Sequence, residues 1–126
     1  MLSDAAIETG KRRTRYTLKE EPLHEHNDCI RIAYEWLDAQ VKTKRVNRKA
    51  RALKHIIERW AGRYVSTHDV DVAAELHPDI HGIYPYFNIS SRLIRPAKRR
   101  LNGISEAFTQ GYKNSDELAN YKADEP

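Results

Sequence analysis

The sequence has one cysteine, Cys29, among its 126 residues, so an intramolecular disulfide is excluded. It has no apolar run near the roughly 18 residues that a membrane-spanning helix needs. The first residues lack the basic stretch and the long apolar stretch of a signal peptide, and we therefore expect none. These absences predict a cytoplasmic protein that does not contact a membrane.

Residues that carry chemistry are also scarce. The five glycines form no phosphate-binding loop, and no GxSxG motif is present. Cys29 falls on the apolar side of an expected helix close to acidic residues, which makes it a poor nucleophile. The nearest histidine pairs, His24 with His26 and His77 with His81, do not have the spacing of a zinc site. We therefore expect no catalytic residues, no metal site, no cofactor and no enzymatic activity.

Positive charge is plentiful, and it is unevenly distributed. The net charge is +4. Lysine and arginine gather in segments 11–15, 42–63 and 92–100, and acidic residues gather in segments 20–38, 69–79 and 116–125. Segregated charge of this kind favours an anionic partner. The alternative is that the three basic segments form solvated faces that bind nothing.

Apolar periodicity predicts three helices. One begins near Asn27, a good N-cap residue, and continues to about residue 41 as a mostly buried scaffold helix. A second spans about 47–61, with Gly62 as its C-cap and a basic back formed by Arg48, Arg51, His55 and Arg59. A third begins at Ser66, where the S-x-x-D spacing is a variant of the capping box, and ends before Pro78.

A fourth helix is expected over about 86–101, and it is the main indication of function. At 100° per residue, Asn88, Arg92, Arg95 and Arg99 fall on one stripe, and Leu93, Ile94, Ala97 and Leu101 fall on the opposite side. Arginine pairs with phosphates or guanine edges, and asparagine suits adenine. Pro96 would kink this helix or divide it into two pieces.

The order of these elements resembles that of winged-helix and helix-turn-helix DNA-binding domains over roughly residues 48–112. The segment 66–74 resembles the first helix of that unit, 88–93 the recognition helix, and 101–104 its exit. The resemblance implies a mainly α fold with an optional C-terminal β-hairpin wing. It also implies groove contacts from Asn88, Ser91, Arg92 and Arg95. The turn of about eight residues and Pro96 depart from the family pattern.

We divide the chain into a flexible basic arm at 1–22, a helical domain at 23–112 and an acidic mobile tail at 113–126. The arm would add phosphate contacts through Arg12 and Arg13. An ordinary frayed terminus is the alternative to such an arm.

The sequence therefore predicts a protein that binds double-stranded DNA, with some sequence selectivity, in transcription regulation or DNA maintenance. It would then be associated with the nucleoid. Phosphate contacts would come from Arg45, Arg48, Lys49, Arg99 and Arg100. The rival hypothesis is a protein-interaction module that forms a homodimer or docks on a larger complex, using an exposed Trp36 on helix 27–41. RNA is a third candidate partner, because basic segments alone do not separate it from DNA.

Overall fold

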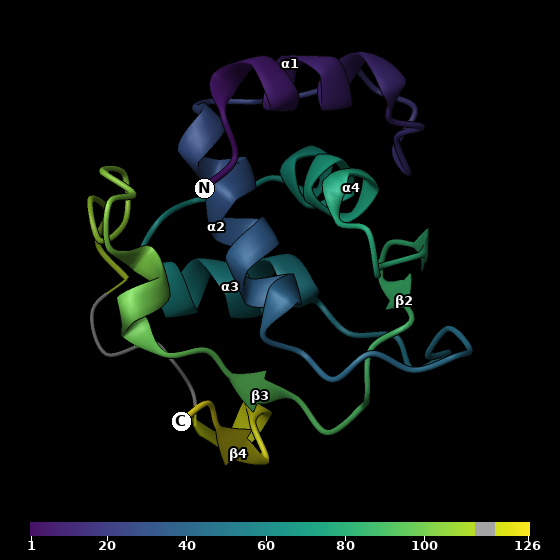
Figure 1. Cartoon of the computed structure of the whole chain (residues 1–126), viewed down its shortest axis with the longest axis vertical. Coiled ribbons are helices and arrows are strands. Elements are labelled where there is room, and N and C mark those ends of the chain that lie inside the picture. Colours follow the sequence, from purple (N-terminus) through teal and green to yellow (C-terminus); the bar gives the residue numbers. More distant parts are fainter. Residues whose placement is uncertain (113–117) are drawn as a thin grey trace.

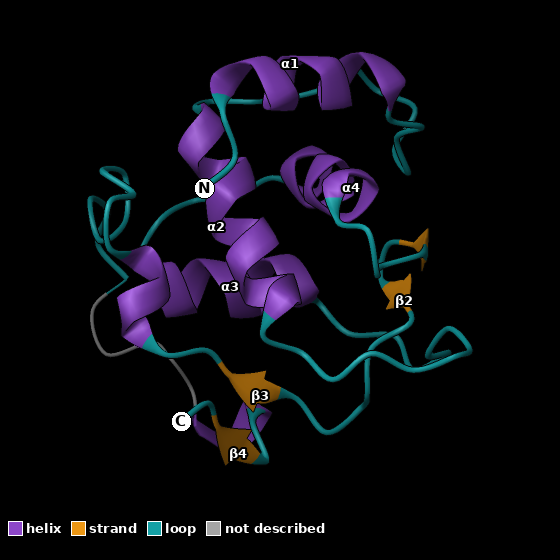
Figure 2. Ribbon diagram, in the orientation of Figure 1, coloured by secondary structure: helices purple, strands orange, loops and turns teal. Residues whose placement is uncertain are grey.

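Helix α2 (Asn27–Asp38) runs through the middle of the protein, and the other helices pack around it (Figure 1). The computed structural model describes residues 1–112 and 118–126. Within them the remaining elements are α1 (Asp4–Arg13), α3 (Leu53–Ala61), α4 (Thr67–Leu76), β1 (Gly82–Ile83), β2 (Tyr86–Phe87), β3 (Ile94–Arg95), η1 (Lys98–Leu101), η2 (Leu118–Asn120) and β4 (Ala123–Asp124). The mainly helical fold class is confirmed, and Figure 2 shows the long loops that connect the elements.

Helix boundaries follow local chemistry. The predicted start of α2 is confirmed, although His26 is the N-cap and accepts a hydrogen bond from the Asp28 N–H. The capping box of α4 is confirmed in both directions between Ser66 and Asp69. Gly62 ends α3 at φ 61°, the left-handed conformation that glycine adopts most easily.

Helix α3 starts at Leu53, six residues later than predicted. The preceding segment is an irregular loop, and its first part bonds to another part of the chain. Thr43 N–H donates to the Asn88 carbonyl at 2.8 Å, and Asn47 N–H donates to the Phe87 carbonyl at 2.9 Å. The apolar face of α3 is buried as expected, with Trp60 fully inaccessible.

The predicted cationic helix over 86–101 is wrong. The segment contains the strands β2 and β3, and only its last four residues are helical, in the 3₁₀ helix η1. Pro96 disfavours helical geometry at Arg95 and supplies no N–H, which suits an extended strand end. The apolar residues still face inward: Leu93 and Leu101 are buried. The stripe of Asn88, Arg92, Arg95 and Arg99 therefore does not exist.

The pairing of strands also differs from the expected wing. Strands β1 and β2 form an antiparallel hairpin at 82–87, whereas the family resemblance implies a hairpin closer to the C-terminus. Residues 104–112 are folded into turns, with Ile104 buried. Strand β3 pairs in parallel with β4, near the C-terminus (Figure 1).

The N-terminal and C-terminal segments, which are predicted to be mobile, pack against the rest of the protein where the structure describes them. Residues 4–13 of the predicted arm form α1, which packs on α4 and buries Ile7. At the other end, Tyr121 is buried and β4 is paired. Residues 113–117 of the predicted tail lie outside the described residues.

Trp36 was expected to be exposed, and this was wrong. It is fully buried, and its indole Nε1–H donates to the Tyr121 hydroxyl at 3.1 Å. A partner surface built on Trp36 is therefore excluded. The bond also connects the central helix to the C-terminal segment.

We expect Tyr121→Phe to lower the free energy of unfolding by about 1–3 kcal/mol, because it leaves the buried Trp36 N–H without its acceptor. Urea denaturation measures this change. Tyr86→Phe is the control, because Tyr86 is exposed and its hydroxyl can bond to water. Equal stability of Tyr121→Phe and the wild type would contradict this role of the hydroxyl.

Candidate nucleic-acid interface

The loop between α2 and α3, residues 39–52, presents an exposed row of cations. Arg45, Arg48 and Lys49, for which phosphate contacts are predicted, are all exposed there. The loop is held in place by its bonds to residues 87–90, including Ser90 N–H to the Val41 carbonyl at 2.8 Å. The cations thus project from a fixed backbone.

The loop ends in a groove of about 590 Å³ between α3 and the C-terminal segment. One wall carries Arg51, His55 and Arg59. His55 and Arg59 are spaced by four residues and so lie along one side of α3, and Arg51 precedes this helix. Lys122 and Asn120 line it from the C-terminal segment, and Lys49 lines it from the loop. None of the described residues that line it is acidic. We call this feature the basic groove.

Glu58 is the one acidic residue within α3, and it faces the interior. It is 3% exposed and accepts hydrogen bonds from Lys54 Nζ at 3.1 Å, His55 Nδ1 at 3.0 Å and the Val65 N–H at 3.1 Å. Its carboxylate is therefore neutralised inside the protein.

Asn88 does not belong to an interface. It is 3% exposed, its Oδ1 accepts from the His81 N–H, and its Nδ2 donates to the carbonyls of Thr43 and Asp79. Its amide oxygen and both of its amide hydrogens are therefore used within the fold, where they connect the loop to residues 79–81. Its predicted contact with a base is wrong.

Arg95 and Arg100 form ion pairs between separate segments of the fold. Arg95 pairs with Asp124 at 2.7 Å across the β3–β4 pair. Arg100 reaches Glu35 and Asp38 at 2.9 Å and Glu125 at 2.6 Å. These hydrogen bonds raise the pKa of Arg100, and they lower the pKa of Glu125 to about 2. Their predicted roles on DNA are contradicted by this use of both side chains.

The other predicted residues are accessible but scattered. Ser91, Arg92 and Arg99 are exposed on the segment from the β2 end to η1. Arg12 and Arg13 are exposed on α1, where Arg13 pairs with Glu75 at 3.0 Å. The structure does not bring either set to the basic groove.

The groove residues that were not predicted as site residues differ in how visible they are in the sequence. The four-residue spacing of Arg51, His55 and Arg59 was visible as the basic back of a helix. Lys122 had no such signal, because it lies in an acidic segment and reaches the groove only through β-pairing with residues 94–95. A tertiary contact of that kind leaves no periodicity in the sequence.

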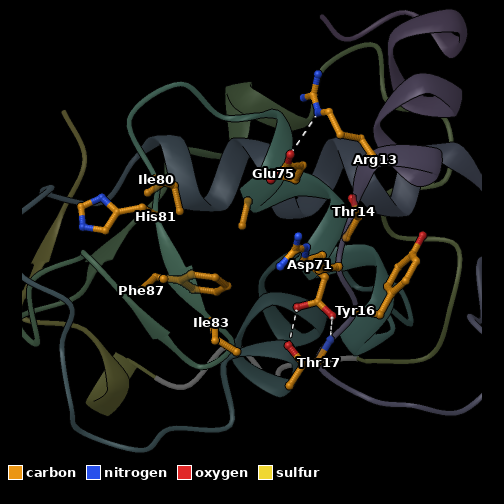
Figure 3. Close-up of a pocket in the computed structure, with 13 residues that line it drawn as sticks. Arg13, Thr14, Tyr16, Thr17, Asp71, Glu75, Ile80, His81, Ile83 and Phe87 are labelled. Carbon is orange, nitrogen blue, oxygen red and sulfur yellow. Dashed lines mark hydrogen bonds and ion pairs between the residues drawn. The ribbon is translucent and has the colours of Figure 1, made fainter.

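A second hollow, of about 550 Å³, lies between residues 13–17, α4 and the β1–β2 hairpin (Figure 3). Its charges are balanced internally. Asp71 accepts from the backbone N–H and the hydroxyl of Thr17, both at 2.9 Å, and Glu75 pairs with Arg13. Burial raises the pKa of Asp71 despite these bonds. With acids among its walls, this hollow suits a polyanion less well than the basic groove.

A hydrogen-bonded chain joins Asp69, His24 and Tyr16. His24 Nδ1 lies 2.7 Å from Asp69 Oδ1, and His24 Nε2 lies 3.0 Å from the Tyr16 hydroxyl. That hydroxyl also bonds to the Lys11 carbonyl, and burial raises its pKa, which disfavours a phenolate nucleophile. These hydrogen bonds connect residues 14–24 to α4.

Other chemistry is weak among the described residues. Burial raises the pKa of the Cys29 thiol to about 12, so it is a poor nucleophile. No three described His, Cys, Asp or Glu side chains are grouped as a metal site requires. Within residues 1–112 and 118–126, every helix is too short or too polar to cross a bilayer.

No protein-family model matches the chain, and no similar curated protein or solved structure was found.

The low pKa of Glu125 predicts a pH-dependent stability. Since its folded pKa of about 2 lies below the ordinary value of 4.5, the stabilisation by ionised Glu125 is complete above pH 4.5. It is lost as the pH falls toward 2. Glu125→Gln should cost about 1–3 kcal/mol at pH 7, and much less near pH 2.

Urea denaturation of the wild type and Glu125→Gln across this pH range measures the effect. The two curves of unfolding free energy against pH should converge at the acidic end. Parallel curves would show that the Glu125 carboxylate contributes no net stabilisation.

Proposed function

We propose that this protein binds DNA by holding the phosphate backbone in the basic groove. The observation that carries the proposal is the convergence of four lysine and arginine side chains, from three separate segments, on a groove with no acidic residue among its described lining residues. A row of phosphates is the common biological ligand whose charge density matches such a surface.

The local backbone supports the same ligand. Ala52, the N-cap of α3, lines the groove and makes no side-chain capping bond. The partial positive charge at the start of a helix adds to that of Lys49 and Arg51 beside it. Phosphate oxygens that enter the groove would therefore meet side-chain donors beside the positive end of the helix.

The exposed loop cations extend this surface. Arg45 and Arg48 precede Lys49 along the loop, so a backbone seated in the groove would continue past them. Contacts of this kind give affinity that is independent of sequence. The proposal rests on phosphate binding alone, because the cationic helix expected to read base edges is not part of the fold. A role in transcription regulation or DNA maintenance is a further part of the proposal.

Fluorescence anisotropy with a 30-nucleotide DNA, single-stranded and as a duplex, across a salt series tests this function. We expect the binding constant to fall steeply with salt. The triple variant Lys49→Ala, Arg51→Ala, Lys122→Ala should reduce the slope of log K against log [salt] by about 2–3, roughly one per lost phosphate contact.

Arg12→Ala is the matched control. It removes an exposed cation from α1, which lies at the opposite end of the molecule from β4 and the segment that carries Lys122 (Figure 1). Its slope should stay near that of the wild type. Absence of DNA binding at low salt, or an equal loss in Arg12→Ala and in the triple variant, would overturn the proposal. Preferential binding of a matching RNA would reassign the groove to RNA.

A further inference from the structure

The β1–β2 hairpin carries the most conspicuous apolar surface next to the cationic loop. Ile83 is 69% exposed and Tyr86 is 40% exposed. With Val46, Arg48 and Gly82 they line an apolar notch of about 460 Å³. We call it the hairpin notch.

The direction of Tyr86 follows from strand alternation. Successive strand residues point to opposite faces, so Phe87 is buried at 1% exposure and Tyr86 turns outward. Tyr84 is also committed to the interior side, where its ring lies edge-on to Phe87 and its hydroxyl accepts the Lys54 N–H at 3.0 Å. Of the three aromatic residues in 84–87, only Tyr86 is available to a ligand.

The notch is held in a fixed shape. Asn88 Nδ2 and the Asn47 N–H bond the hairpin end to the loop at 3.1 and 2.9 Å. Gly82 has a φ of 111°, and a side-chain Cβ there would collide with the Tyr86 carbonyl oxygen. The two strands thus approach more closely than another residue would permit. The backbone that carries Tyr86 therefore needs little reorganisation to receive a flat partner.

The hairpin notch and the basic groove are lined by adjacent residues of the loop. Arg48 lines the notch, and its neighbour in the chain, Lys49, lines the groove. An aromatic ring and an arginine beside a phosphate-binding groove is the combination that single-stranded nucleic-acid binders use, with bases stacked on rings and phosphates on cations.

We propose that the hairpin notch binds one unpaired base against Tyr86, so that the preferred ligand is DNA with a single-stranded segment. This inference rests on the proposed DNA binding. In an intact duplex both faces of each base are covered by stacked neighbours, and only base edges reach the grooves. A ring platform can therefore add affinity only for a base that has left the stack.

The test compares single-stranded DNA with the same sequence as a duplex, at low salt. The single strand carries one 2-aminopurine, whose fluorescence reports stacking. Tyr86→Ala should weaken single-strand binding about tenfold and should restore 2-aminopurine fluorescence, whereas Tyr86→Phe should keep both near the wild type. Duplex affinity should be the same in all three proteins.

Two further variants guard against indirect effects. Ile83→Ala removes the other wall of the notch and should weaken single-strand binding in the same direction. Leu18→Ala, at a residue 41% exposed on the segment after α1, should leave it unchanged. Circular dichroism and thermal unfolding check that each variant keeps the fold.

The outcomes separate the two proposals. If Lys49→Ala weakens both DNA forms and Tyr86→Ala changes neither, the notch does not bind a base, while the proposed function stands. Equal losses of single-strand and duplex binding in Tyr86→Ala also overturn the base assignment. If neither DNA form binds, the proposed function fails, and this inference fails with it.

Discussion

Two buried amide side chains, Asn88 and Gln40, determine the course of the second half of the chain. Gln40 exchanges a pair of hydrogen bonds with the backbone of Ile94, at 2.9 Å in each direction, as a strand partner would. Asn88 also bonds to backbone groups, those of Thr43 in the loop and of Asp79 and His81 ahead of the hairpin. An unpaired backbone group in such a position would cost free energy, so these amides fix the segment as extended. The basic groove and the hairpin notch both depend on that course.

The parts of the fold that sequence patterns could predict are those decided within a few residues. The start of α2, the capping box of α4 and the glycine that ends α3 each follow from local side chains and backbone geometry. The segment 86–101 could not be predicted in this way. Its apolar residues suit one face of a helix as well as alternate burial in an extended chain. The backbone partners that favour the extended form include residues 40–47 and 122–125, which are distant in the sequence.

The candidate site shows the same division. The exposed cations of the loop were recognisable from charge clustering, and the basic back of α3 was recognisable from its spacing. Arg95 and Arg100 have the same side-chain chemistry, but carboxylates from α2 and the C-terminal segment hold them. Whether an arginine serves a ligand or the fold depends on where acidic residues arrive in three dimensions. The sequence shows that the charge is present, and the packing shows which of the described charges form ion pairs within the fold.

The position of Lys122 has a consequence for the thermodynamics of the whole chain. The groove is closed on one side by a segment that is itself held by β-pairing, by Tyr121 and by Glu125. A ligand seated there binds only molecules in which this segment is docked, so its binding free energy is linked to the docking equilibrium. Occupancy of the groove and order of the C-terminal segment are therefore reciprocal: each increases the population of the other.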